Sequence, residues 1–267
     1  MTHLPGRIAW IAIAPVKSMA LVFLERAELT LDGIPGDRAF AWIDDSGRLV
    51  NGKRAGWLAT IQADHDPVAA SLSIRFQDGS VADGAVELGE PVQALFSRHP
   101  RPARLVVGPW SAAMSARTGL DLRLVALEAG DGADRGPSAT LVSSAALGEL
   151  AAVGGEADPL DRRRFRMTFG VEGIPAYEED RWIGRDVRIG AAIVGVAGNV
   201  GRCAVTTHDP DTGRPTFDTL RYLDQTRGHL PSTEPLPFGV WTEVIAPGAV
   251  AVGDPVALVD AAGGEAS

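Results

Sequence analysis

Short stretches with alternating apolar and polar residues fill the first hundred positions of the chain. Residues 7–14 are rich in β-branched and aromatic side chains and end at Pro15, and residues 21–31 alternate with a period of two, as β-strands do. Further short strands are predicted over residues 39–43, 48–51, 58–63, 72–76, 86–88 and 92–95. Turn sequences such as DGIPGD (32–37), DDSG (44–47) and QDGS (77–80) separate them. Regularly spaced short strands with turns between them predict a β-barrel or a β-sandwich.

The second half of the chain combines strands with two short helices. The segment SATLVSSAALGELAAVGG places apolar residues at helical spacing, with Ser143 or Ser144 as the N-cap and Gly154–Gly155 as the stop. Another helix is expected over residues 218–227, and a polar, glycine-rich loop over residues 128–137. Strands are expected over residues 165–171, 186–196, 203–207, 240–245 and 250–259. The predicted fold class is therefore mostly β, of the barrel type, with a few helices.

Composition and charge narrow the classes of protein that fit. A length of 267 residues allows one large domain or two small ones, and 45% hydrophobic with 22% charged residues excludes a disordered chain or a coiled coil. The net charge of −9 disfavours bulk nucleic-acid binding but leaves room for a local basic pocket. No apolar run has the roughly 18–20 residues of a transmembrane helix, so we expect no membrane association and a cytoplasmic protein.

Cys203 is the first candidate for chemistry, and it is the only cysteine of the chain. One cysteine excludes an intrachain disulfide, a four-cysteine zinc site and a cysteine-bound iron–sulfur cluster. Arg202 beside it favours the thiolate, the form that attacks electrophiles or binds soft metals. The alternative is a buried cysteine that acts as a small hydrophobic side chain.

Two polar residues follow this cysteine along the chain. On a strand, five residues would separate Cys203 from His208 and place the two on opposite faces, which disfavours a Cys–His hydrolase. Asp209 begins DPDTG, which resembles part of a calcium-binding loop but lacks the acidic ligand downstream. We therefore expect a tight turn at this position.

Several groups suit an anion. Lys17 and Ser18 in APVKS, together with Arg38 in GDRAFAWID, would bind a phosphate or another oxyanion. The expected helix that begins near Ser143–Ser144 adds free N–H groups at its N-terminus. The densest basic run, DRRRFRMTF, contains Arg162, Arg163, Arg164 and Arg166, and its alternative role is a solvated edge strand that resists aggregation. None of these features by itself indicates a specific function.

Taken together, these segments resemble the MOSC family, in the group that carries an N-terminal MOSC β-barrel and includes the mitochondrial amidoxime-reducing components and bacterial relatives. The likeness runs through PVKS, DGIPGDRAFAWID and NGKRAGWLATI, and then through RFRMTF, AYEEDRW, GRCAVTTHDPDTGRP, PFGVW and PGAVAVGDPVAL, in the order of the family. The resemblance implies an N-terminal MOSC-type β-barrel domain over residues 1–97, a MOSC β-barrel domain over residues 98–260 and a disordered tail over residues 261–267.

The resemblance also implies a cofactor and its ligands. Proteins of this group bind a molybdenum–molybdopterin cofactor (Moco) between two β-rich regions, with the cysteine of the RC pair, here Cys203, as a thiolate ligand of the metal. Carried over residue by residue, Cys203 and Asp209 are the catalytic candidates. The cofactor-binding candidates are Lys17, Ser18, Arg38, Ser143, Ser144, Arg166, Arg202 and Thr207. Pyridoxal phosphate binding enters only as a family-level expectation.

The implied activity is that of an oxidoreductase that removes oxygen from N-hydroxylated small molecules. Since the chain lacks the cysteines of a ferredoxin domain, its electrons must come from a separate reductase, ferredoxin or cytochrome-type partner. The chain departs from the family at Arg166-Met167-Thr168, where RPN is usual, so one cofactor or substrate contact is expected to differ. Two alternatives stay open: a sulfur or cofactor carrier with a persulfide on Cys203, and a divergent member that has lost the cofactor.

Overall fold

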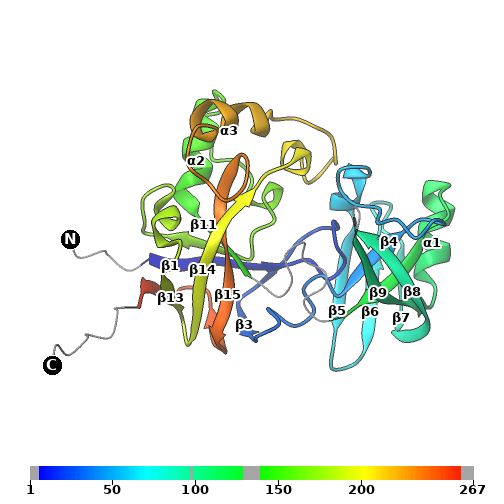
Figure 1. Ribbon diagram of the computed structural model, residues 1–267. Helices are drawn as coiled ribbons and strands as arrows, with labels where there is room; N and C mark the ends of the chain where they lie inside the picture. The colour runs from blue at the N-terminus through cyan, green and yellow to red at the C-terminus, as the bar shows by residue number, and fades with distance from the viewer. Residues whose placement is uncertain (1–5, 97–98, 129–138, 260–267) are drawn as a thin grey trace.

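The computed structural model describes residues 6–96, 99–128 and 139–259, and strands dominate these three segments. The strands form two β-rich lobes that lie side by side (Figure 1). The predicted fold class, mostly β with a few helices, is confirmed. The three α-helices of these segments are α1 (Trp110–Thr118), α2 (Ser144–Val153) and α3 (Thr219–Arg227).

Seven strands close into a barrel in the lobe that holds most of the second half of the chain. The barrel closes because β12 pairs with β11 on one side and with the N-terminal strand β1 on the other. Around the barrel the strands are β12 (Phe169–Glu172), β11 (Ala139–Ser143), β15 (Pro237–Ala246), β14 (Ala192–Gly201), β13 (Asp186–Ile189), β17 (Pro255–Leu258) and β1 (Gly6–Ile13). The short strand β2 (Val22–Leu24) extends the sheet beyond β1.

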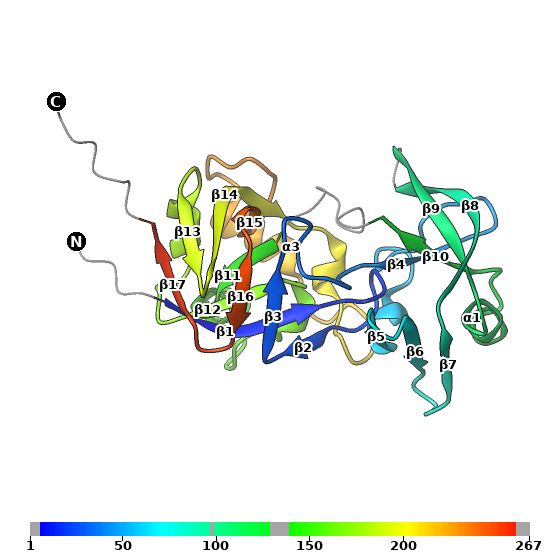
Figure 2. The same ribbon diagram turned by 90° about the horizontal axis from the view of Figure 1, so that it is seen from below.

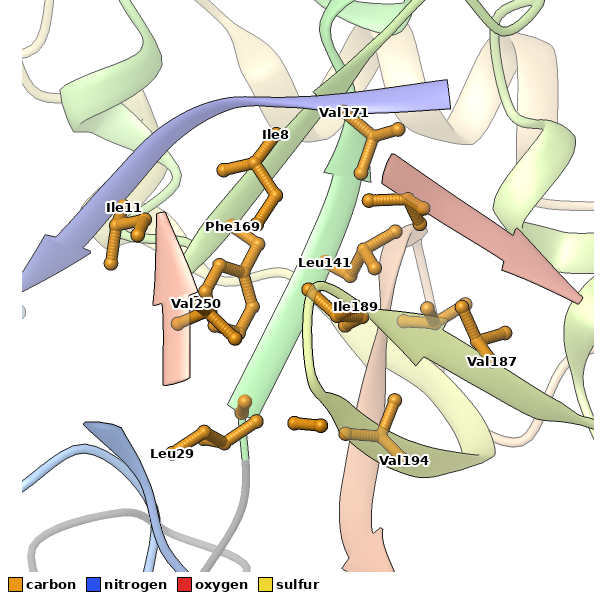
Figure 3. Close-up of a cluster of buried hydrophobic side chains, with 14 of the residues drawn as sticks. Ile8, Ile11, Leu29, Leu141, Phe169, Val171, Val187, Ile189, Val194 and Val250 are labelled. Atoms are coloured by element: carbon orange, nitrogen blue, oxygen red, sulfur yellow. The ribbon is translucent and has the colours of Figure 1, made fainter. Parts of the chain in front are cut away.

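Apolar side chains fill this barrel because alternate residues of each strand point inward. Along β13, Val187 and Ile189 are buried whereas Asp186 and Arg188 are exposed. Figure 3 shows these two apolar residues together with Phe169 and further buried neighbours from other strands. Burying each large side chain of this kind stabilises the fold by about 1.5–3 kcal/mol. The period-two pattern of the sequence thus becomes the core that holds the barrel together.

The smaller lobe packs two sheets and one helix around a second core. Its strands are β4 (Phe40–Ile43), β10 (Arg123–Leu127), β9 (His99–Val107) and β8 (Glu87–Phe96) in one sheet, and β5 (Gln62–Asp66), β6 (Ser71–Arg75) and β7 (Val81–Ala85) in the other. Trp110 of α1 is fully buried, and its indole N–H donates to the carbonyls of Leu72 and Ala82 at 3.2 and 3.0 Å. Helix α1 therefore anchors the three-stranded sheet, although the sequence analysis did not predict it.

Three strand predictions are wrong in part, because 3-10 helices replace strand residues. Residues 56–60 form η1 (Gly56–Thr60) just before β5, and the basic run begins with η2 (Arg162–Arg164) instead of an edge strand. The sequence predicts a strand over residues 203–207, but these residues contain η4 (Ala204–Thr207). There the carbonyl of Cys203 accepts hydrogen bonds from both the N–H and the hydroxyl of Thr206, each at 3.0 Å. This local threonine bonding competes with strand formation.

Strand pairing crosses the boundary that the sequence predicts between the two domains. That boundary, between residues 97 and 98, lies between β8 and β9, which pair along their length. Strands β1 and β2 join the barrel, and β3 (Arg26–Leu29) pairs with β16 (Gly248–Ala251), so the N-terminal segment runs from one lobe to the other (Figure 2). The sequence limits of the domains therefore stay a prediction, and the expected tail over residues 261–267 lies outside the described residues.

Candidate active site

A cavity of about 640 Å³ lies between the two lobes, and both contribute to its wall. The smaller lobe and the segment that leads into it supply Lys17, Ser18 and Arg38, which the sequence analysis selected. The barrel lobe supplies Arg166, Arg202 and Cys203, which were also selected. The volume is within the range of cavities that bind small molecules and cofactors. The structure thus brings together six of the predicted site residues.

Three residues of this cavity hold a left-handed backbone that favours glycine. Ser18, Arg38 and Arg166 have φ angles of 72°, 52° and 56°. Among the described residues, three further non-glycine residues have positive φ, so half of these conformations are found at the cavity. Each costs about 1–2 kcal/mol, and strained backbone of this kind clusters at functional sites.

Arg38 connects the two sides of the cavity. One of its terminal nitrogens pairs with the carboxylate of Asp37, whose other oxygen accepts a hydrogen bond from the N–H of Ala14 at 2.8 Å. Its second terminal nitrogen donates to the main-chain carbonyl of Arg166 at 3.3 Å. The guanidinium of Arg38 is therefore held in place from both lobes.

Arg166 has a buried guanidinium nitrogen, Nη2, without a hydrogen-bond partner among the described residues. Burial, reinforced by the charge of Arg38, lowers the pKa of Arg166 to about 10. Buried N–H groups are nearly always paired in folded proteins, and a charged one left unpaired is costly. Because Arg166 lines the cavity, an anionic ligand there would supply the missing acceptor.

Arg202 lies beside Cys203, but its donors are already used. Its Nε donates to the carbonyl of Phe238 at 2.9 Å and its Nη1 to the carbonyl of Phe165 at 2.8 Å. The guanidinium carbon also lies 5.6 Å from the ring centroid of Phe165 and 5.7 Å from that of Phe238. Burial lowers the pKa of Arg202 to about 9. Arg202 therefore positions the backbone around the thiol and adds positive charge beside it.

Cys203 is a free, half-buried thiol at the start of η4. Thr206 bonds back to its carbonyl, as described above, and the carbonyl of Thr206 in turn accepts from the hydroxyl of Thr219 in α3 at 2.9 Å. The hydroxyl of Thr207 donates to the carbonyl of Ala204 at 2.7 Å, and Thr207 does not line the cavity. A chain of hydrogen bonds from α3 through η4 thus fixes the backbone that carries the thiol.

Ser143 and Ser144 lie outside the cavity wall. Ser143 is fully buried at the N-cap of α2, where the carboxylate of Glu179 is also fully buried. Burial raises the pKa of Glu179 to about 7, although main-chain N–H groups of Glu179 and Ser143 oppose this shift. The group at the N-terminus of α2 is therefore a carboxyl of the chain itself, and its raised pKa means that it keeps a proton up to about neutral pH.

Asp209 is also outside the cavity wall, and it closes the tight turn that the sequence predicts. One oxygen of its carboxylate accepts from the N–H groups of Asp211 and Thr212 at 3.1 and 2.9 Å. Arg164 approaches its other oxygen at 3.6 Å and donates to the carbonyl of Thr207 at 3.0 Å. Asp209 thus shapes the loop after η4 and contacts Arg164, which does line the cavity.

The wall also contains residues that the sequence analysis did not select. Lys53 comes from the turn before η1, and the ring of Phe96 has Lys17 and Arg101 at 5.4 and 4.9 Å from its centroid. The unusual Thr168 accepts a hydrogen bond from the N–H of Thr140 at 3.1 Å. Lys53 carries a signal in the sequence, since it is one of two lysines in the chain.

Positive charge dominates this wall even though the whole chain is acidic. Glu234 is the one carboxylate side chain among the described residues of the wall. The cations of the wall are Lys17, Lys53, Arg38, Arg164, Arg166 and Arg202. A cavity lined by one sign of charge concentrates ligands of the opposite sign. The geometry therefore favours an anionic ligand.

The described residues contain no group of three His, Cys, Asp or Glu side chains arranged to hold a metal ion. Within the same ranges, no helix combines the length and the apolar character that crossing a membrane requires.

Comparison with known proteins assigns two consecutive family domains. The MOSC N-terminal beta barrel domain matches residues 5–104, and the MOSC domain matches residues 136–257. Mitochondrial amidoxime reducing component 2 of Homo sapiens is 38% identical over 99 residues, which are 34% of this chain and 29% of the human protein. Mitochondrial amidoxime-reducing component 1 of Xenopus laevis is 35% identical over 105 residues, which are 37% of this chain and 30% of that protein. The chain thus matches less than a third of the length of these relatives.

Among solved structures, the YUAD protein from Bacillus subtilis is similar over 95% of this chain and 94% of its own, with a TM-score of 0.43 and 12% sequence identity. The comparisons support neither a cytoplasmic location nor pyridoxal phosphate binding, and the relatives named above are mitochondrial. The two matched domains and the barrel show that the chain belongs to the MOSC-domain proteins with an N-terminal MOSC β-barrel domain, and that it resembles the mitochondrial amidoxime-reducing components.

Proposed function

We propose that this protein is a molybdenum-cofactor oxidoreductase that removes oxygen from N-hydroxylated small molecules. The observation that carries the proposal is the convergence of one free thiol, Cys203, with six cations on one cavity between the lobes. The names of the amidoxime-reducing relatives support the reaction class.

The side chains of the cavity fit an anionic cofactor that contains a soft metal. A thiolate is a soft ligand, and Cys203 is the one thiol of the chain. The buried Nη2 of Arg166 has no hydrogen-bond partner among the described residues. A phosphate oxygen of the cofactor would accept a hydrogen bond from it. Since the described residues hold no three-ligand metal group, the remaining ligands would belong to the cofactor.

Different residues of the cavity wall would bind different parts of the cofactor. Lys17, Ser18, Arg38 and Arg166 would hold the phosphate and the pterin. Cys203 would bind the metal through its thiolate. When bound, the cofactor supplies two-electron oxygen-atom transfer, while the protein positions it and sets its electrostatic surroundings.

Arg202 would act on Cys203 in two ways. Its charge lies next to the thiol, and its bonds to Phe165 and Phe238 keep the loop in place. Thr207 and Asp209 would act through the backbone of η4 and the following turn. Ser143 and Ser144 would act through the position of α2.

Turnover would also need electrons from a separate protein, of the reductase, ferredoxin or cytochrome type. The assay therefore combines the purified holoenzyme with such a donor and benzamidoxime as substrate. We expect Cys203→Ser to abolish reduction while Ser46→Ala, in an exposed turn of the smaller lobe, leaves it unchanged. Full activity of Cys203→Ser would overturn the assignment of the metal ligand. Labile sulfur on Cys203 without bound molybdenum would instead identify a sulfur carrier.

A further inference from the structure

We propose that Lys53 selects N-oxygenated substrates that carry a carboxylate, an inference that rests on the proposed function. The chain has two lysines against 23 arginines, and both lysines, Lys17 and Lys53, line the cavity. An ammonium is a compact point charge with three donors, whereas a guanidinium is planar and bidentate. In a chain that uses arginine for nearly every other cation, lysine at these two positions indicates a requirement for the ammonium.

Lys53 sits on a rigid turn next to the thiol loop. The side chain of Asn51 accepts the N–H of Lys53 at 3.0 Å, and the carbonyl of Asn51 accepts the N–H groups of Arg54 and Ala55 at 3.0 and 2.9 Å. Gly52 packs against Val205 of η4 so closely that an added Cβ would lie 3.3 Å from that side chain. The turn therefore packs against the side chain of Val205, two residues after Cys203.

The other cations of the cavity either make hydrogen bonds within the protein or belong to the proposed cofactor site. Arg38 bonds Asp37 and the carbonyl of Arg166, and Arg202 bonds two main-chain carbonyls. Arg164 bonds the carbonyl of Thr207 and the hydroxyl of Thr216. Arg166 and Lys17 belong to the proposed cofactor site.

Among the described residues of the cavity wall, Lys53 is the one cation to which neither role applies. Its side chain is exposed and makes no hydrogen bond or ion pair to the described residues. Apolar groups of Leu49, Phe96 and Val205 line the same cavity. These apolar groups and Lys53 would together bind a substrate with a flat aromatic ring, whose carboxylate pairs with the ammonium of Lys53. The substrate class is therefore an aromatic N-oxygenated carboxylate.

The test compares 4-carboxybenzamidoxime with benzamidoxime as substrates of the holoenzyme. We expect Lys53→Gln to lower the ratio of kcat/KM for the charged over the neutral compound about tenfold, the size of one hydrogen bond to a charged group. Lys53→Glu should lower it further. Arg54→Gln is the matched control, because Arg54 is an exposed neighbour that pairs with Asp44 outside the cavity.

A second readout needs no turnover. Calorimetry on the oxidised holoenzyme without an electron donor gives the Kd for 4-carboxybenzamidoxime, which should rise about tenfold in Lys53→Gln. An unchanged Kd and an unchanged kcat/KM ratio in this variant would overturn the role of Lys53, even if both compounds are reduced. A raised Kd with no reduction of either compound would support Lys53 and contradict the proposed reaction.

Discussion

The Nη2 atom of Arg38 donates a hydrogen bond to the main-chain carbonyl of Arg166 at 3.3 Å. The two residues are 128 positions apart, and both hold a left-handed backbone. This one contact joins the loop before β4 to the segment before β12 at the cavity wall. Burial, reinforced by the charge of Arg38, lowers the pKa of Arg166, and an anion bound at this wall would offset both effects.

Arg166→Leu should stabilise the cofactor-free protein by about 1–3 kcal/mol, because it removes a buried N–H that has no acceptor. It should also abolish retention of the cofactor, a trade between stability and function. Urea unfolding of protein made without the cofactor measures the first effect. Arg164→Leu is the control and should destabilise, since Arg164 bonds Thr207 and Thr216. Equal destabilisation by both variants would contradict this account of Arg166.

The contact between Gly213 and Gly56 joins the loop after η4 to the smaller lobe. A Cβ on Gly213 would lie 2.6–2.7 Å from main-chain atoms of Gly56 and its neighbour, and Gly213 has a φ of +69°. Gly79 has a φ of +82° with no atom within 4 Å of such a Cβ. Gly79→Ala should therefore cost about 1 kcal/mol of stability from backbone strain alone. Gly213→Ala should cost about 1–3 kcal/mol more, because the backbone must move.

Chemical denaturation of the two glycine variants separates these effects. Equal losses of unfolding free energy would show that the loop and the smaller lobe are not in the close contact described here.

Much of the fold could be predicted from local pattern. The β-branched and aromatic residues predict β1, the short run between two turn sequences predicts β4, and the serine and glycine signals predict the bounds of α2. The sequence of η4, AVTT, predicts a strand, but the Thr206 hydroxyl donates to the carbonyl of Cys203 and favours a 3-10 turn there. The closure of the barrel by β1 and β12 depends on partners far apart in the sequence, so no local signal reveals it.

The site was predictable where a residue lies in a motif and its side chain reaches the cavity, as for Lys17 and Cys203. It was not predictable at the N-terminus of α2, where Glu179 from a distant segment occupies the position expected for a ligand. The role of Lys53 needed both the composition and the three-dimensional position of the NGKRAG turn.

Glu179 should make stability fall as the pH rises. Its pKa of about 7 in the folded protein lies above its ordinary value of 4.5, so between these two pH values the folded state keeps a proton that the unfolded state releases. The folded protein therefore loses up to about 3 kcal/mol from pH 4.5 to just above pH 7. Glu179→Gln should remove this dependence, and Glu172→Gln, at an exposed strand end, should keep it. Urea unfolding across pH 4.5–8 gives the measurement, and parallel profiles for wild type and Glu179→Gln would contradict the assignment.

The most direct test is the molybdenum content of the protein purified from a host that makes the cofactor, measured by elemental analysis beside Cys203→Ala. Cys203 is the one thiol on the cavity, so we predict close to one molybdenum per wild-type chain and a clear loss in the variant. Folded wild-type protein without molybdenum, or full retention in Cys203→Ala, would contradict the claim that this cavity binds the cofactor through Cys203.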